Sequence, residues 1–573
     1  MTENAQPIRA GADMSTGEQP SRTPSAIDAV AEDWVATLAE LDPLVAVWIG
    51  GMADSGGYGD FSPSGREDYV AAASRTIAAL DALPATDSVD EVTKADLRAS
   101  LALDIEEFEA GLHLRDLNVI ASPAQGIREV FDLMPTSTVD DWETVSTRLG
   151  NVSGAIDGYI ESLREGIRRG VVPAKRQVRE VFEQAKKLAD GDGFFAGLAA
   201  NATPEDGQLP ASLANELTRR AGEASVAYQE LADFFARELE PAATEKDAVG
   251  REIYAIQSRK FLGATIDLDE TYEWGIEELA RMVAEQESIA DLIKPGAGVL
   301  EAIEHLDADS SRKLHGTDAL RTWMQETSDR AVDELSRSHF DIPDPVKRLE
   351  CMIAPTQEGG IYYTSPSDDF SRPGRMWWSV PEGVTEFDTW RELTTVYHEG
   401  VPGHHLQLGQ AVYNRAMLNT WRRQLAGTSG HAEGWALYAE RLMQELGYLD
   451  DPADRLGMLD GQRMRAARVV LDIGVHLEKQ LPDGSGPWNA EYAFDFMGRN
   501  VNMNDGFVRF EVNRYLGWPG QAPSYKVGQR IWEQIRDESR SREGDAFDMK
   551  AFHKRALDLG GVGLDTLRAA LLG

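Results

Sequence analysis

The sequence predicts a large, mainly α-helical protein made of two lobes. Apolar residues recur at intervals of three and four positions through most of the first 340 residues, which is the period of an amphipathic helix. Pro343 and Pro345 then interrupt this pattern, because proline disrupts a helix and restricts the residue before it. We therefore expect an N-terminal helical lobe over 26–344, a C-terminal helical lobe over 345–573, and a disordered segment over 1–25.

The N-terminal lobe should consist of long amphipathic helices. The first carries apolar residues from Ile27 to Leu41 and stops at Asp42-Pro43. A longer one, of about eight turns, extends past Val145 and ends at Gly170, a residue type that commonly follows a helix C-terminus. Further helices are expected near 178–190, 211–240, 270–290 and 317–337.

The C-terminal lobe should add a small β-hairpin or ribbon to the helices. Residues 361–364 and 376–380 are rich in aromatic and β-branched side chains, and a connection rich in Pro, Gly, Ser and Asp separates them. This pattern is typical of two short strands joined by a loop. Helices are expected on the C-terminal side of it, over 389–412, 429–447, 456–481 and 525–540.

The composition limits the possible functions. Lys and Arg total 57 against 96 Asp and Glu, and the net charge of −39 should repel nucleic acid and anionic membranes. The one cysteine, Cys351, excludes an internal disulfide or a cysteine-rich zinc site and fits a reducing compartment. Because neither a signal peptide nor an apolar membrane span is evident, we expect a cytoplasmic protein with no nucleic-acid or membrane partner.

The stretch "VYHEGVPGHHLQLG" is the best candidate for a metal site. In the H-E-x-x-H helix of zinc hydrolases, two imidazoles one turn apart bind the metal and the glutamate activates a water molecule. Here the residue four after His398 is Pro402, and in a straight helix His398 and His405 would lie roughly 10 Å apart. If Pro402-Gly403 marks a bulge that loops out two residues, an H-E-x-x-H arrangement is recovered. The second imidazole would then be His404 or His405.

This stretch resembles the H-E-F-G-H-A-L-H motif of the thimet-oligopeptidase type of gluzincin. Matching its Gly-His step to Gly403-His404 favours His404 as the ligand and directs His405 either toward substrate or behind the metal ligands. Gluzincins take a third protein ligand from a later helix, and the resemblance implies Glu433 in "HAEGWALYAE" for this role, with His431 and Glu440 as competing ligands. It thus implies one zinc ion on His398, His404 and Glu433, with Glu399 as general base.

A wider resemblance rests on four stretches, "HEGVPGHH", "EGWALY", "RVVLDIGVH" and "RYLGWPGQAPSYKVG", in this order. Together they resemble the bacterial domain-of-unknown-function 885 family. The match covers at least residues 350–535, and we expect it to extend from about residue 26. The resemblance implies a mostly helical, zincin-like (gluzincin-type) body and a metal-dependent peptidase activity, without identifying a substrate.

Other polar residues are candidates for contact with the substrate. Arg465, Arg468, Asp472 and His476 form a polar stripe on an otherwise apolar helix, which should face either a cavity or a buried structural network. Gluzincins commonly use a late Tyr or His as oxyanion donor, which implies Tyr525, with His476 as the other candidate. The remaining candidates for substrate binding are His405, Arg468, Arg514, Tyr515, Tyr363 and Trp377.

These features together predict a zinc-dependent peptidase, an oligopeptidase or a carboxypeptidase, that hydrolyses short peptides with Glu399 as the base. Two alternatives stay open: a metal-dependent amidase or esterase acting on a small non-peptide metabolite, and a non-catalytic protein that retains the cleft. The sequence does not distinguish a monomer from a homodimer.

Overall fold

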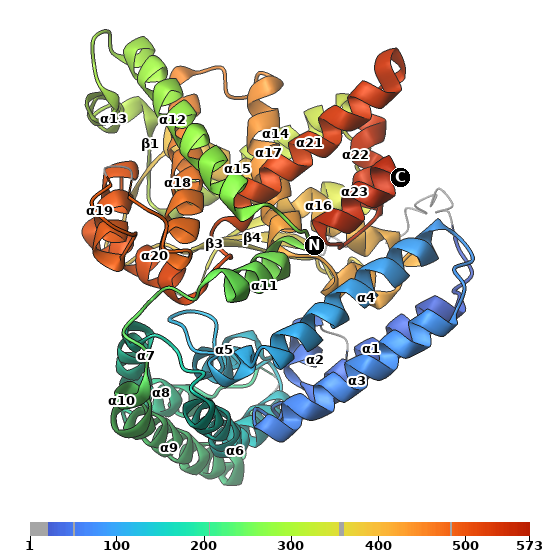
Figure 1. The fold of residues 1–573 in the computed structure, drawn as a ribbon, viewed down its shortest axis with the longest axis vertical. Coiled ribbons are helices and arrows are strands. Elements are labelled where there is room, and N and C mark those ends of the chain that lie inside the picture. The colour runs from blue at the N-terminus through green and yellow to red at the C-terminus, as the bar shows by residue number, and fades with distance from the viewer. Residues whose placement is uncertain (1–20, 50–51, 206, 355–359, 482–483) are drawn as a thin grey trace, which may run out of the picture.

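The computed structural model describes residues 21–49, 52–205, 207–354, 360–481 and 484–573. The protein is predominantly helical, which confirms the predicted fold class (Figure 1). Helices α1 to α10 form the lower body in Figure 1, and most of the later helices form the upper body. In the described part of the chain, no helix combines the length and the apolar character needed to cross a membrane.

The lower body contains two hydrophobic cores. The first surrounds Trp34 and Leu97 and is built by α1 (Ala26–Leu41), α3 (Pro63–Ala82) and α4 (Ser88–Glu109). The second surrounds Tyr159 and Tyr228. Its elements are α2 (Leu44–Ile49), α5 (Pro123–Leu133), α6 (Val139–Arg169), α7 (Lys175–Leu188), α8 (Phe194–Ala200), α9 (Ala211–Phe234) and the short turn η2 (Phe235–Leu239). The short turns η1 (Leu112–Leu114) and α10 (Glu240–Ala242) lie beside it in the sequence.

Helix α6 is the long helix predicted from the sequence, and both of its ends follow from local chemistry. The Thr138 side chain accepts a hydrogen bond from the Asp141 backbone N–H and so caps the first turn. Gly170 ends the helix in the left-handed conformation, with φ of 71°, which glycine adopts without steric cost.

The upper body has one continuous hydrophobic core that extends from Tyr254 to Leu567. Its helices are α11 (Arg251–Leu262), α12 (Leu268–Ile293), α13 (Val299–Asp307), α14 (Thr317–Ser338), α15 (Thr389–Glu399), α16 (His404–Tyr413), α17 (Ser429–Glu445), α18 (Pro452–His476), α19 (Ala490–Asn500), α20 (Asp505–Gly517), α21 (Ser524–Glu543), α22 (Met549–Asp558) and α23 (Leu564–Leu572). Short turns lie at η3 (Ser310–Arg312), η4 (Asp344–Lys347), η5 (Asn414–Ala416), η6 (Trp421–Leu425) and η7 (Gly544–Ala546).

The division between the two bodies lies at 243–250, between α10 and α11, and not at the predicted 344/345. Pro343 and Pro345 follow the end of α14, but the chain does not leave the upper core there. Phe340, Ile342 and Val346 are all buried in it. A helix-breaking proline therefore marks the end of an element here without marking the end of a folding unit.

A small sheet packs against α15 (Thr389–Glu399). Strands β3 (Ile361–Thr364) and β4 (Gly374–Trp378) pair antiparallel, as predicted, and β2 (Leu349–Ile353), which was not predicted, pairs parallel with β4 on its other side. A second pair joins β1 (Lys313–His315) to β5 (Glu386–Asp388). Met376 and Trp378 pack with Val396 of α15 in a separate apolar cluster, so the sheet fixes the helix that carries His398.

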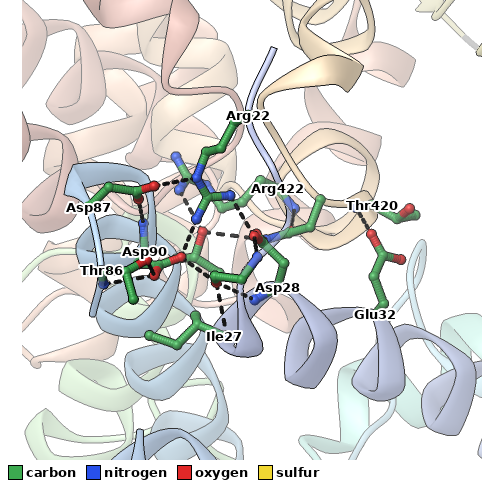
Figure 2. A network of polar contacts seen from close by, with 12 residues as sticks. Arg22, Ile27, Asp28, Glu32, Thr86, Asp87, Asp90, Thr420 and Arg422 are labelled. Atoms are coloured by element: carbon green, nitrogen blue, oxygen red, sulfur yellow. Dashed lines mark hydrogen bonds and ion pairs between the residues drawn. The ribbon is translucent and has the colours of Figure 1, made fainter. Parts of the chain in front are cut away.

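The segment preceding α1 links the two bodies. Residues 21–25 fall in the stretch predicted to be disordered, yet Arg22 pairs with Asp28, Asp87 and Asp90, as Figure 2 shows. The Arg22 backbone N–H also donates to the Ala416 carbonyl oxygen of the upper body at 3.1 Å. The prediction of disorder is therefore wrong for 21–25, because a buried carboxylate, Asp90, is available to Arg22, and 1–20 lie outside the described residues.

Candidate functional site

A break between α15 and α16 brings two imidazoles together. Helix α15 ends at Glu399 and α16 begins at His404, so the interruption covers 400–403, the place where the sequence predicted a bulge. The rings of His398 and His404 consequently lie with their centroids 4.8 Å apart. Gly403 makes this possible, since a Cβ atom there would lie 1.9 Å from the His398 carbonyl oxygen.

His398, Glu399 and His404 form a buried group that could hold a metal ion. Their candidate ligand atoms all lie within 4.8 Å of one another. Glu433 on α17 faces the same group, with its Oε2 at 3.2 Å from His398 Nε2 and 3.6 Å from His404 Nε2. The Glu433 side chain is 23 % exposed and lines a cavity of about 500 Å³, so this cavity reaches the edge of the group at Glu433.

Glu440, supported by Gln462, orients the His398 ring through its Nδ1 atom. His398 Nδ1 donates to Glu440 Oε1 at 2.8 Å, which leaves Nε2 facing the group. Gln462 Nε2 donates to Glu440 Oε2 at 3.3 Å, and Lys526 Nζ in turn donates to Gln462 Oε1 at 2.6 Å. Burial alone would lower the pKa of His398, but hydrogen bonds with Glu433 and Glu440 raise it to about 10. The two carboxylates therefore stabilise positive charge at this imidazole.

Glu399 differs from the other carboxylates because it has an unused oxygen. Glu399 Oε2 is buried and accepts no hydrogen bond from the described residues, and His404 Nδ1 is buried without a partner in the same way. Burial raises the pKa of Glu399, although the charges of His404 and His398 oppose the shift. A poorly hydrated carboxylate of raised pKa is suited to accept a proton.

Close contact between α17 and α21 places Tyr525 near Glu433. A Cβ on Gly434, next to Glu433, would lie 2.5 Å from the carbonyl carbon of Gly528, and Tyr525 lies one turn before Gly528. The pKa of Tyr525 is raised chiefly by burial and then by the charge of Glu433, as expected for a tyrosine in this neighbourhood. Glycine at both positions is needed because the two backbones leave no room for a side chain.

Replacing Gly528 with alanine should destabilise the upper body. The new Cβ would lie 2.3 Å from the Gly430 carbonyl oxygen, and overpacking of this kind costs about 1–3 kcal/mol. Urea denaturation should show this loss, whereas the control Gly222→Ala, at a helical position of α9 with no atom within 4 Å, should be neutral or slightly stabilising. Equal stability of Gly528→Ala and wild type would contradict the close contact.

Four predicted site residues lie in a separate buried network between α18 and α20. Arg468 donates from Nη2 to Glu511 Oε2 at 2.7 Å and from Nε to the Tyr515 hydroxyl at 2.6 Å, and Arg514 donates to Glu511 Oε1 at 3.2 Å. His476 is fully buried and donates from Nε2 to the Tyr515 carbonyl oxygen at 3.0 Å. The network also reaches the edge of the site: the Arg468 guanidinium carbon lies 5.2 Å from the centre of the Tyr525 ring, and Arg514 donates to Gln521, which lines the cavity beside Glu433. Glu511 pairs with both arginines, so these residues have a structural role, and their predicted roles in substrate binding or catalysis stay predictions.

His405 and Tyr363 connect α16 to the sheet. His405 Nε2 donates to the Val346 carbonyl oxygen at 2.7 Å, and Nδ1 accepts from the Tyr363 hydroxyl at 2.9 Å. Burial lowers the pKa of His405 to about 4, so the ring is neutral. Because every polar atom of these two side chains has a partner within the fold, His405 lies behind the ligands, which is the second of its two predicted places, and a contact of either side chain with substrate stays a prediction. Trp377 Nε1 donates to Thr364 Oγ1 at 3.0 Å, and no contact between described residues ties Trp377 to the His398 group.

Gln462 and Lys526 were not recognised from the sequence, and Glu440 was considered only as a competing ligand. The signal for Glu440 is its position seven residues after Glu433, two turns along one helix face. Lys526 is fully buried, but its sequence neighbours Ser524, Gln529 and Arg530 are polar and do not indicate this burial. The signal for Glu440 does not identify Gln462, because Gln462 comes from a different helix.

Comparison with solved structures shows that this fold occurs in other proteins. A "putative lipoprotein" from Colwellia psychrerythraea aligns with a TM-score of 0.82 over 96% of this chain and 98% of that chain, at 22% sequence identity. A "putative lipoprotein of unknown function" from Shewanella oneidensis aligns with a TM-score of 0.73 over 96% and 100%, at 18% identity. A Pyrococcus furiosus carboxypeptidase aligns at 12% identity over 96% of each chain, but its TM-score of 0.40 is too low to indicate a shared fold. No curated protein matches the sequence.

The descriptions of these two structures contradict the cytoplasmic location predicted above, and we do not retain that prediction. It rested on the lack of an apolar segment, but a lipid-anchored protein needs no spanning helix because its acyl chains supply the membrane affinity. The model of one bacterial family, described as proteins of unknown function and designated DUF885, matches residues 43–571. The chain therefore belongs to the bacterial family DUF885.

Proposed function

We propose that this protein is a metal-dependent hydrolase that cleaves short peptides and holds one zinc ion on His398, His404 and Glu433. The observation that supports this most is that the Nε2 atoms of both imidazoles face the same carboxylate oxygen, at 3.2 and 3.6 Å, inside a buried group. Two histidines and a glutamate are a known donor set of catalytic zinc sites, which keep one position open. The buried, unpartnered Glu399 Oε2 and His404 Nδ1 fit a polar ligand at this place.

A zinc ion bound here would lower the pKa of a water molecule and polarise the carbonyl group to be cleaved. Glu399 then acts as general base: its carboxylate accepts the proton of the attacking water and delivers it to the nitrogen of the leaving amine. Glu440 holds the His398 ring in place throughout. The Tyr525 hydroxyl donates a hydrogen bond to the carbonyl oxygen as negative charge develops on it.

The cavity beside Glu433 supports a small substrate. Its volume of about 500 Å³ is in the range of sites that bind small molecules and short peptides, and it is too small for a folded protein. Phe261 and Trp518 provide apolar lining, while Gln407 provides a polar group. Digestion of a peptide library tests the substrate class: hydrolysis of N-acyl amino acids but not of unblocked peptides would show that the enzyme is an amidase.

Metal analysis tests the site directly. The purified protein should contain close to one zinc per chain, and chelation should remove the zinc and the hydrolytic activity together. His404→Ala should lose zinc, because it removes a ligand, whereas the neighbouring His405→Ala should keep zinc, because His405 binds Val346 and Tyr363 instead. Zinc retained by His404→Ala and lost by His405→Ala would show that the two histidines have exchanged roles.

A further inference from the structure

Arg465 of α18 is a cation without a partner. Its Nε is buried and makes no hydrogen bond, and no ion pair or hydrogen bond among the described residues involves its guanidinium group. Its neighbours on the helix are engaged, since Arg468 pairs with Glu511 and Arg463 donates to Gln286 and Asn500. An unpaired arginine is unexpected in a chain with 96 acidic residues against 57 basic ones, because charged groups in protein interiors are normally paired.

The position of Arg465 on α18 places it beside the candidate metal centre. Gln462, one turn earlier on the same helix face, donates to Glu440 Oε2 at 3.3 Å. Arg468, one turn later, lies with its guanidinium carbon 5.2 Å from the centre of the Tyr525 ring. Arg465 therefore lies between the groups that orient His398 and the tyrosine proposed to stabilise the oxyanion. Its charge also opposes the burial that raises the pKa of Glu399 and adds to the interactions that lower the pKa of Glu440, as expected for a guanidinium group near both.

Gly461 makes room for the guanidinium group. A Cβ atom at that position would lie 2.8 Å from Arg465 Nη1, so the side chain folds back along the helix over the glycine. An arginine that served only to neutralise the carboxylates of the site would approach one of them within 4 Å, as Arg468 approaches Glu511. Arg465 forms no such pair with a described residue, and Glu433 and Glu440 are paired with His398 instead.

We propose that Arg465 binds the C-terminal carboxylate of the peptide substrate and that the enzyme is consequently a carboxypeptidase. This inference rests on the proposed function. A guanidinium group matches a carboxylate with two parallel hydrogen bonds, which makes arginine the residue best suited to this contact. Because Arg465 lies near Glu399, the bound anion must lie close to the bond being cleaved. Every peptide carries one anionic group close to its last peptide bond, which is the α-carboxylate of the C-terminal residue.

The test uses the full-length, zinc-loaded protein and an N-acylated tripeptide that ends in leucine, supplied as the free acid and as the C-terminal amide. Wild type should hydrolyse the free acid with a kcat/KM about 30-fold or more above that of the amide, the size of effect expected for a buried charge contact. Arg465→Met should lower kcat/KM for the free acid to the level of the amide and leave the amide unchanged. Arg463→Met, two residues earlier on α18, is the matched control and should keep the wild-type preference.

The outcomes separate this inference from the proposed function. Hydrolysis of acid and amide at equal rates by wild type would overturn the carboxylate contact and leave the peptidase intact. If Arg465→Met lowered kcat/KM equally for the acid and the amide, Arg465 would act on the reacting carbonyl group instead. This result would also overturn the carboxylate contact. Failure of the zinc-loaded wild type on both peptides would reject the proposed function itself. If Arg465→Met loses zinc or unfolds, Arg465→Lys, which keeps the charge but not the paired donors, should still reduce the preference for the acid.

Discussion

Glu399→Gln should lower kcat by about 10²- to 10⁴-fold while zinc remains bound. Glutamine has nearly the shape of glutamate and fills the same buried space, but it cannot accept the proton of the attacking water. The Glu399 oxygen lacks a hydrogen-bond partner among the described residues, so the substitution should disturb the fold little. Steady-state kinetics with a peptide substrate, together with zinc analysis of the same preparation, measures both effects.

Glu392→Gln provides the matched control for this variant. Glu392 lies two turns earlier on the same helix, and burial raises its pKa to about 7, so glutamine resembles the protonated form already present near neutral pH. We expect activity close to that of wild type. Substantial activity in Glu399→Gln would remove the general base from the mechanism, and a loss of zinc would instead make Glu399 a metal ligand.

Gly403→Ala should abolish zinc binding and, with it, activity. A Cβ at this position would lie 1.9 Å from the His398 carbonyl oxygen and 2.5 Å from that of Tyr397, so the chain between α15 and α16 would have to move. Because this connection determines the distance between His398 and His404, a shift of about 1 Å is enough to spoil the coordination geometry. Zinc content per folded chain and kcat/KM are the two measurements.

Gly498→Ala is the corresponding control, since a Cβ on this helical glycine of α19 would have no atom within 4 Å. It should bind zinc like wild type and be unchanged or slightly more stable. If Gly403→Ala also bound zinc normally, the geometry of 400–403 would not be what brings the two imidazoles together.

The helices were the most predictable part of the fold. The apolar period and Gly170 predicted α6, and the aromatic runs predicted β3 and β4. These signals are local, so they can be recognised without knowing the fold. The lobe boundary was not predictable in the same way. Whether a chain stays in a core after a proline depends on distant partners, such as those that bury Phe340 and Val346.

In the candidate site, too, local signals were predictable and distant partners were not. The short spacing predicted that His398, Glu399 and either His404 or His405 would lie together around one helix interruption, and the resemblance to gluzincins favoured His404. The polar stripe on α18 was visible in the sequence, but the partner of each member was not. Glu511 arrives from α20 and engages Arg468, whereas nothing among the described residues engages Arg465, although both arginines occupy the same stripe.

The connection from α16 to α17 is hydrogen-bonded to α1, the first helix of the chain. The Thr420 N–H donates to Glu32 at 2.6 Å (Figure 2). Asn419 Nδ2 donates to Asp28 at 2.9 Å, and Trp421 is buried among residues of α1, α3 and α4. This connection begins on the helix of His404 and ends on the helix of Glu433. The N-terminal lobe therefore does more than cover the proposed site. Its removal should free the connection between α16 and α17, the helices that carry two of the proposed zinc ligands.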